Sequence, residues 1–257
     1  MHVGHKVGAW TNDFVQLFRG PIINEFYKEP PEHYLGYTLD GRVPVILIPG
    51  ILNRWGYMKK LGNKISLLGH PVHIVPELGL NISNIPSSAR LLHSLVVQLT
   101  PKNRRMLPDV QKDAEAIRKH IEAKNLKGIV LVAHSKGGLI GKYLLAHHNH
   151  DGRVLGLIAV ATPFSGSALV KMIPHSSFTE LKMDSKIISD LQKRSEVNRQ
   201  IVSIYPEYDT HIWAPKGSYL EGAENIEVPV HGHSVLDKKE IQTAVLKAVE
   251  KITLRQK

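Results

Sequence analysis

The sequence contains no cysteine, which excludes a disulfide framework, a thiolate nucleophile and a metal site with thiolate ligands. It also contains no apolar run long enough to span a bilayer, and residues 1–6 lack the apolar core of a secretion signal. We therefore expect a cytoplasmic location, although a mature chain whose signal has been removed would look the same. The 257 residues suit one large α/β domain with a sizeable hydrophobic core.

Acidic residues are in the minority, because 23 aspartates and glutamates face 33 lysines and arginines and leave a formal net charge of +10. Such a surplus attracts nucleic acid or anionic lipid. The basic residues are scattered, however, and no nucleic-acid-binding motif accompanies short clusters such as residues 102–105. We expect no nucleic-acid partner, and peripheral contact with an anionic membrane surface stays open.

Apolar runs and helical periodicities alternate along the chain. Strands are predicted at residues 43–48, 71–76, 128–134, 155–161, 201–205 and 226–230. Helices are predicted at residues 55–68, at 109–121, after residue 135, and from Asp237 onward with Glu240 as its capping-box partner. This alternation predicts a mostly parallel, doubly wound sheet with helices on both faces.

Residues 128–138 carry a buried-type strand into Ser135, which small residues flank. This is the pattern of a nucleophile elbow, a strand-to-helix turn so sharp that the serine adopts a positive φ and its hydroxyl lies above the end of the sheet. Ala133 and Gly137 stand where a larger side chain would collide with the turn. A serine in this place can also simply cap the helix. We favour a nucleophilic Ser135.

An acid and a histidine follow later predicted strands, where the carboxyl ends of parallel strands collect functional groups. Asp209 follows the strand at 201–205, with Glu207 as the alternative acid. His233 follows the last strand, with His231 as the alternative histidine. The order serine, acid, histidine along the chain predicts a triad of Ser135, Asp209 and His233.

A weaker candidate is the histidine-rich segment at residues 147–151, which offers metal-ligating side chains. Consecutive residues at a helix end point in different directions, and histidines there also suit the helix dipole. We therefore expect neither a metal nor another cofactor.

Taken together, residues 42–250 resemble the small lipase and triacylglycerol-lipase-like branch of the α/β-hydrolases. The resemblance rests on six segments in register: 48–51, 132–138, 161–167, Ser203-Ile204-Tyr205 with Asp209, 220–225 and Gly232-His233. The family usually has a histidine where this chain has Pro49, and a glycine where it has Ala133. Residues 1–40 fall outside the resemblance as an N-terminal extension that we expect to be partly helical, so residues 41–257 form the expected hydrolase domain.

The resemblance implies that the chain cleaves carboxylic esters of small-molecule or lipid alcohols through an acyl-enzyme. The backbone N–H groups of Ile51 and Lys136 would then form the oxyanion hole. Two other function classes share these residues: an acyltransferase that passes the acyl group to an alcohol or amine, and a non-catalytic hydrolase-fold binding protein. The sequence leaves the oligomeric state open.

Residues 164–198 connect the strands predicted at 155–161 and 201–205, a connection in which this fold commonly carries a cap over the active site. Apolar residues recur at roughly helical spacing, and Asp184 and Ser185 can begin a second short helix; the recurring residues are Phe178, Leu181, Ile188 and Leu191. The plain alternative is a crossover helix packed on the sheet. We expect a small cap, with Met172, Ile173 and Phe178 at the substrate.

Overall fold

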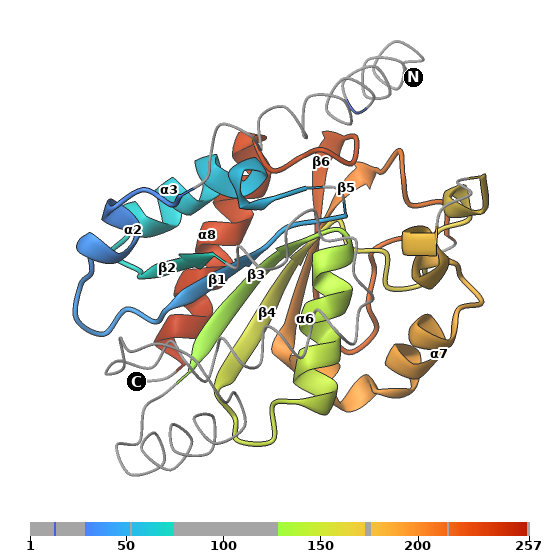
Figure 1. The fold of residues 1–257 in the computed structure, drawn as a ribbon, viewed down its shortest axis with the longest axis horizontal. Helices are drawn as coiled ribbons and strands as arrows, with labels where there is room; N and C mark the ends of the chain where they lie inside the picture. The colour runs from blue at the N-terminus through green and yellow to red at the C-terminus, as the bar shows by residue number, and fades with distance from the viewer. Residues whose placement is uncertain are drawn as a thin grey trace.

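The computed structural model describes residues 13, 29–51, 53–74, 128–172, 176–214 and 216–255. Its centre is a six-stranded sheet in which each adjacent pair of strands is parallel, in the order β2-β1-β3-β4-β5-β6 (Figure 1). The strands are β1 (Val45–Ile48), β2 (Val72–Ile74), β3 (Ile129–His134), β4 (Val154–Val160), β5 (Ile201–Tyr208) and β6 (Glu224–His231). The parallel, doubly wound sheet predicted from the sequence is confirmed.

Helices connect these strands. They are α2 (His33–Gly36), η1 (Trp55–Met58), α3 (Lys59–Leu67), α6 (Lys136–His147), η3 (Leu169–Met172), η4 (Ser176–Leu181), α7 (Lys186–Lys193), η5 (Ser195–Gln200) and α8 (Lys239–Leu254). The helix predicted at 55–68 is present, with a 3-10 first turn, and the chain leaves it through Gly69 at φ 84°. The helix predicted at 109–121 lies outside the described residues. No described helix is long and apolar enough to cross a membrane.

The start of the last helix differs from the prediction. Helix α8 begins at Lys239, and the N-cap position is Lys238, whose side chain makes no capping hydrogen bond. Asp237 lies one residue before the N-cap, in a turn that is closed by a hydrogen bond from the Lys238 N–H to the Val235 carbonyl. The predicted capping box is therefore wrong, although Glu240 does lie in the first turn.

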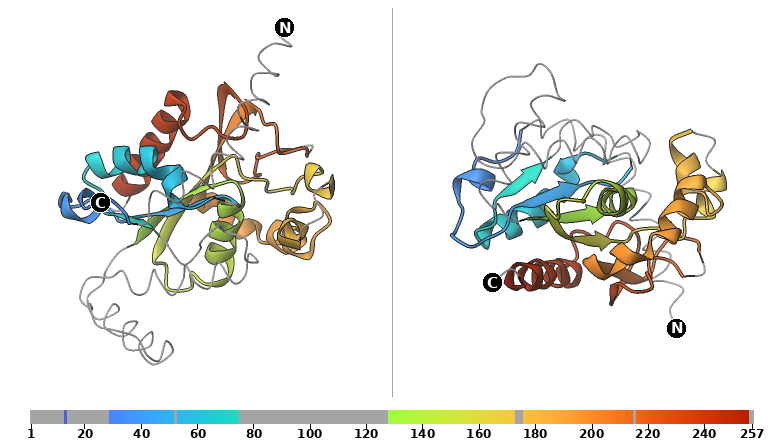
Figure 2. Two further views of the ribbon diagram at one scale, coloured as in Figure 1. Left: turned by 45° about the horizontal axis from the view of Figure 1, so that its top comes forward. Right: turned by 90° about the horizontal axis from the view of Figure 1, so that it is seen from below.

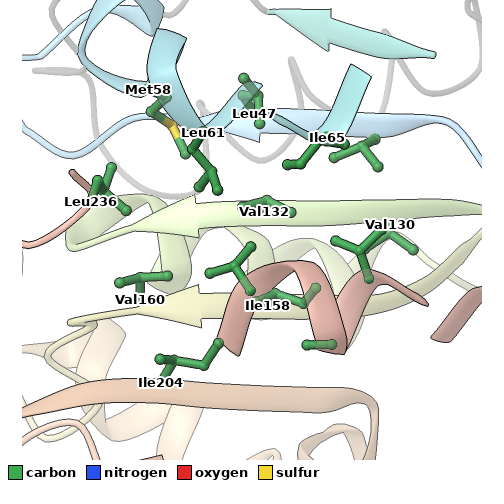
Figure 3. Close-up of a cluster of buried hydrophobic side chains, with 14 of the residues drawn as sticks. Leu47, Met58, Leu61, Ile65, Val130, Val132, Ile158, Val160, Ile204 and Leu236 are labelled. Atoms are coloured by element: carbon green, nitrogen blue, oxygen red, sulfur yellow. The ribbon is translucent and has the colours of Figure 1, made fainter. Parts of the chain in front are cut away.

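The sheet separates two hydrophobic clusters because neighbouring residues of a strand point to opposite faces. On one face, Leu131 and Leu157 pack with helices α6 and α7. On the other face, Val132 and Ile158 pack with η1, α3 and α8 (Figures 2 and 3). Every residue of β1 and of β3 is buried, as expected for central strands that helices cover on both sides.

The strand order places a switch point between β1 and β3. From β1 the chain moves outward to β2, and from β3 it moves in the opposite direction to β4, β5 and β6. The loops that follow β1 and β3 therefore separate, and a crevice opens at the carboxyl ends of these two strands, where ligands bind in open α/β sheets. Ile51 and Ser135 lie at this point.

Candidate active site

The serine of the elbow has the predicted backbone conformation. Ser135 joins β3 to α6 with φ 53° and ψ −125° and is one of two non-glycine residues with positive φ in the described part of the chain. Its backbone N–H donates to the carbonyl of Val160 on β4. Ala133 is fully buried and pairs with Ile48 on β1 and with Ala159 on β4, so little space remains beside the turn.

His233 lies between the serine and an aspartate. Its Nδ1 is 2.9 Å and 3.0 Å from the two carboxylate oxygens of Asp209, and its Nε2 is 2.9 Å from the hydroxyl oxygen of Ser135. Because a carboxylate only accepts hydrogen bonds, Nδ1 carries the proton and Nε2 of the neutral ring is free to accept from Ser135. The structure thus brings together the three residues predicted as a triad, at the ends of β3, β5 and β6.

Asp209 and His233 each favour the charged form of the other. Burial opposes ionisation of Asp209, but hydrogen bonds from His233 and from the backbone N–H groups of His211 and Ile212 hold the pKa of the carboxyl below its ordinary value. Burial also disfavours the imidazolium form of His233, yet the charge and hydrogen bond of Asp209, aided by Asp13, raise the histidine pKa above 6.5. The environment therefore favours the ion pair that forms when His233 takes a proton.

The alternative residues lie elsewhere. Glu207 on β5 and His231 on β6 face each other, with His231 Nε2 3.6 Å from the Glu207 carboxylate, and more than half of the Glu207 side chain is exposed. In the metal candidate, His147 Nε2 is 2.8 Å from Asp190, and Asp151 is paired with Arg153. These pairings use side chains that a metal site at residues 147–151 would require.

An apolar cavity of about 130 Å³ opens beside the serine. Its polar lining includes Ser135 and His233, and its apolar wall is contributed by Leu169, Val170, Phe178, Leu181 and Ile212. Phe178 is half-buried and is one of the three side chains predicted to contact substrate. Ile173 and the side chain of Met172 lie outside the described residues.

The segment 164–198 contributes to both the cavity and the core. Phe178 and Leu181 line the cavity and also pack in the hydrophobic cluster of α6, to which Ile188 and Leu191 on α7 belong. Helix α7 begins as predicted, because the Ser185 hydroxyl oxygen accepts the Ile188 N–H. Helix α7 therefore resembles the plain crossover alternative, and the cap over the substrate stays a prediction.

The two positions proposed for the oxyanion hole flank the serine. Lys136 is the first residue of α6, and Ile51 lines the cavity after β1. The β1 loop and the elbow are in close contact, since a β-carbon built on Gly50 would lie 3.0 Å from the β-carbon of Ser135. The β1 loop and the elbow therefore lie against each other at Ser135, and the roles of the Ile51 and Lys136 N–H groups stay a prediction.

Side chains that sequence reasoning missed surround His233. The rings of His134 and His211 lie 5.0 Å and 4.6 Å from its ring, and Nε2 of His134 donates to its carbonyl oxygen. Burial and the charge of His233 lower the pKa of His134 to about 3 and that of His211 to about 4. The buried carboxylate of Asp13 accepts the backbone N–H of His233. No sequence motif marked Asp13, because it belongs to the segment outside the resemblance.

Two lysines are buried in α6, which was not expected either. The side chain of Lys136 is inaccessible, and burial lowers its pKa while the charge of Glu180 on η4 opposes this effect. Lys142 lies with its ammonium 5.9 Å from the centre of the Phe164 ring, and burial lowers its pKa to about 8.

Comparison with solved structures gives the same fold. Lipase BlEst2 of Bacillus licheniformis in its mature form has a TM-score of 0.62 and 12% identity, with 84% of this chain and 94% of that chain covered. Lipase B of Aspergillus fumigatus has a TM-score of 0.60 and 15% identity, with 86% and 55% covered. A metagenomic carboxyl esterase has a TM-score of 0.54 and 14% identity, with 86% and 77% covered. No curated protein matches the sequence.

The family comparison covers more than half of the chain. The family model that describes the alpha/beta hydrolase fold matches residues 43–193, a range that begins two residues before β1 and ends with α7. This range includes the elbow, and the observed sheet and helices agree with it. The chain therefore belongs to the α/β-hydrolase fold family.

Proposed function

We propose that the protein hydrolyses carboxylic esters through an acyl-enzyme formed on Ser135. The observation that carries this proposal is the continuous chain of hydrogen bonds from Asp209 through His233 to Ser135 at the mouth of an apolar cavity. A serine hydroxyl is a weak nucleophile until a neighbouring base takes its proton. Neutral His233 is placed to do so, and Asp209 fixes its tautomer and stabilises the resulting cation.

In this proposal the ester carbonyl lies above Ser135, between the β1 loop and the start of α6. Attack by the serine oxygen forms a tetrahedral intermediate, whose oxyanion receives hydrogen bonds from the backbone N–H groups of Ile51 and Lys136. His233 then gives its proton to the leaving alcohol. Water, deprotonated by the same histidine, then attacks the acyl-enzyme; the bond between the acyl group and the Ser135 oxygen breaks, His233 returns the proton to that oxygen, and the acid leaves.

The cavity suggests the size of the acyl group. An apolar cavity of roughly 150 Å³ in another protein holds benzene, a molecule of six carbons. The cavity here is about 130 Å³, and its wall is mainly aliphatic and aromatic. We therefore propose short to medium acyl esters as better substrates than insoluble triglyceride.

The decisive experiment is a panel of esters from acetate to decanoate, assayed with wild-type protein and Ser135→Ala, together with labelling by a serine-reactive fluorophosphonate. We expect the alanine variant to lose about 10⁴-fold or more in turnover and all labelling, with an unchanged melting temperature. A variant that keeps a tenth of wild-type turnover would refute the nucleophile. Products formed with added alcohol acceptors measure acyl transfer, and a wild-type protein that neither turns over nor labels would be a binding protein.

A further inference from the structure

Asp13 is a buried carboxylate that contacts both loops of the candidate active site. Only 1% of its surface is exposed. One carboxylate oxygen accepts the backbone N–H of His233 at 2.8 Å, and the other accepts the backbone N–H of Ser234 at 2.8 Å. The hydroxyl of Thr210, the residue after Asp209, donates to the first oxygen. A single side chain thus links the loop of the proposed acid to the loop of the proposed base.

The close approach of this carboxylate depends on a glycine. Gly232 has φ 109°, a conformation that other residues rarely adopt. A β-carbon built on Gly232 would also lie 3.1 Å from a carboxylate oxygen of Asp13. The glycine before His233 therefore provides the backbone turn and leaves room for Asp13.

A buried carboxylate is costly unless donors satisfy it, so its presence needs a reason. Here the three donors are a hydroxyl and two backbone N–H groups, which are all neutral. They satisfy the carboxylate oxygens but do not neutralise the negative charge of Asp13. Asp13 adds to Asp209 in raising the pKa of His233. Among the described residues, His134 and His211 are the titratable neighbours of the His233 ring, and their lowered pKa values leave them neutral near pH 7. Tyr57, on which the charges of Asp13 and Asp209 also act, is neutral there as well because burial raises its pKa.

We propose that Asp13, contributed by the N-terminal segment, is a positioning residue that fixes the loops of Asp209 and His233 and stabilises the imidazolium form of His233. The proposal rests on the proposed ester hydrolysis. In the resting enzyme the carboxylate holds the backbone of His233, so that Nε2 stays in line with the Ser135 hydroxyl. During attack its charge favours the protonated histidine.

The test compares Asp13→Asn with wild type, and with Asp40→Asn as a matched control at an exposed position outside the site. An asparagine in this place keeps the shape but loses the charge and one acceptor oxygen. We expect kcat on a short ester to fall by about 10- to 100-fold with little change in KM, because small misplacements of reacting groups are costly. The acid limb of the pH–kcat profile should move to lower pH, because the imidazolium loses a neighbouring negative charge.

Thr210→Val provides a second variant that keeps the Asp13 charge and removes the hydroxyl that joins the loops. We expect a lower kcat without any movement of the acid limb to lower pH. This variant decides the question if Asp13→Asn does not fold, since unchanged kcat in Thr210→Val would overturn the proposal. A lower kcat in Asp13→Asn with the acid limb unmoved would also overturn it, because that result describes a structural residue only.

An NMR titration of the His233 imidazole separates this proposal from the proposed function, because it needs no substrate. The histidine pKa should be lower in Asp13→Asn than in wild type and in Asp40→Asn, and equal values in all three would contradict our inference. If the wild-type protein shows neither ester turnover nor fluorophosphonate labelling, the proposed function fails, and the titration still decides whether Asp13 acts on His233.

Discussion

Replacing Gly137, the second residue of α6, by alanine tests the geometry of the elbow, and the structure indicates how large the loss of stability should be. A β-carbon built on this glycine would lie 2.5 Å from the carbonyl oxygen of Ile48 and 2.8 Å from that of Pro49. Both are backbone atoms and cannot rotate away. Because overpacking costs roughly 1–3 kcal/mol, we expect Gly137→Ala to lie near the upper value, which lowers the melting temperature by about 6–12 °C.

The same collision should also impair catalysis. Ile48 and Pro49 lead into the loop of Ile51, so the added methyl group moves one proposed oxyanion donor relative to the other. Loss of one such donor costs about 10²–10³-fold in turnover, and we expect a loss of about 10²-fold or more in kcat. Gly36→Ala is the control, since a β-carbon on Gly36 meets no atom within 4 Å. Thermal denaturation and ester turnover measure both effects, and a Gly137→Ala enzyme with wild-type values would refute this account of the elbow.

Three further results are expected. Activity should rise with pH with a midpoint above 6.5, because only neutral His233 accepts the serine proton and its pKa is raised; a midpoint below 6.5 in a pH–kcat/KM profile would contradict this. Asp209→Asn should fold, judged by circular dichroism, but be severely slowed; full activity would refute Asp209 as the acid. Phe178→Ala should weaken decanoate turnover by about 5- to 30-fold, since roughly 1–2 kcal/mol of apolar contact is lost, and should barely change acetate turnover. Equal losses on both esters would place Phe178 in the core instead of the acyl site.

The sequence predicted the central strands well because their burial on both faces requires uninterrupted apolar runs. It was less accurate at the last two strands. Strand β5 continues through Pro206 to Tyr208, where the register with β6 shifts, and such irregularities are places where a sheet tolerates proline. Strand β6 lies at the edge of the described sheet, so exposed residues such as Glu227 interrupt its apolar pattern. The prediction of 226–230 was therefore too short at both ends.

For the candidate site, the sequence was informative wherever local geometry demands a residue type. Ser135 between small residues is such a case, because the turn itself excludes bulk. Asp13 is the opposite case, since it joins the site across 220 residues of sequence and no local pattern reports that contact. The burial of Lys136 and Lys142 could not be predicted either. Nothing in the sequence of a helix distinguishes a lysine whose side chain is buried from one whose ammonium group reaches solvent.

The buried ammonium group of Lys142 couples folding to alkaline pH. Its pKa is about 8 in the folded protein, against an ordinary value of 10.5. Between these two values the unfolded chain holds a proton that the folded protein has released, so unfolding takes up a proton and becomes less favourable as the pH rises. Lys136 acts in the same direction, because its pKa is also lowered. The buried lysines of helix α6, which begins directly after the proposed nucleophile, therefore make the protein more stable under mildly alkaline conditions, where His233 is also in its neutral form.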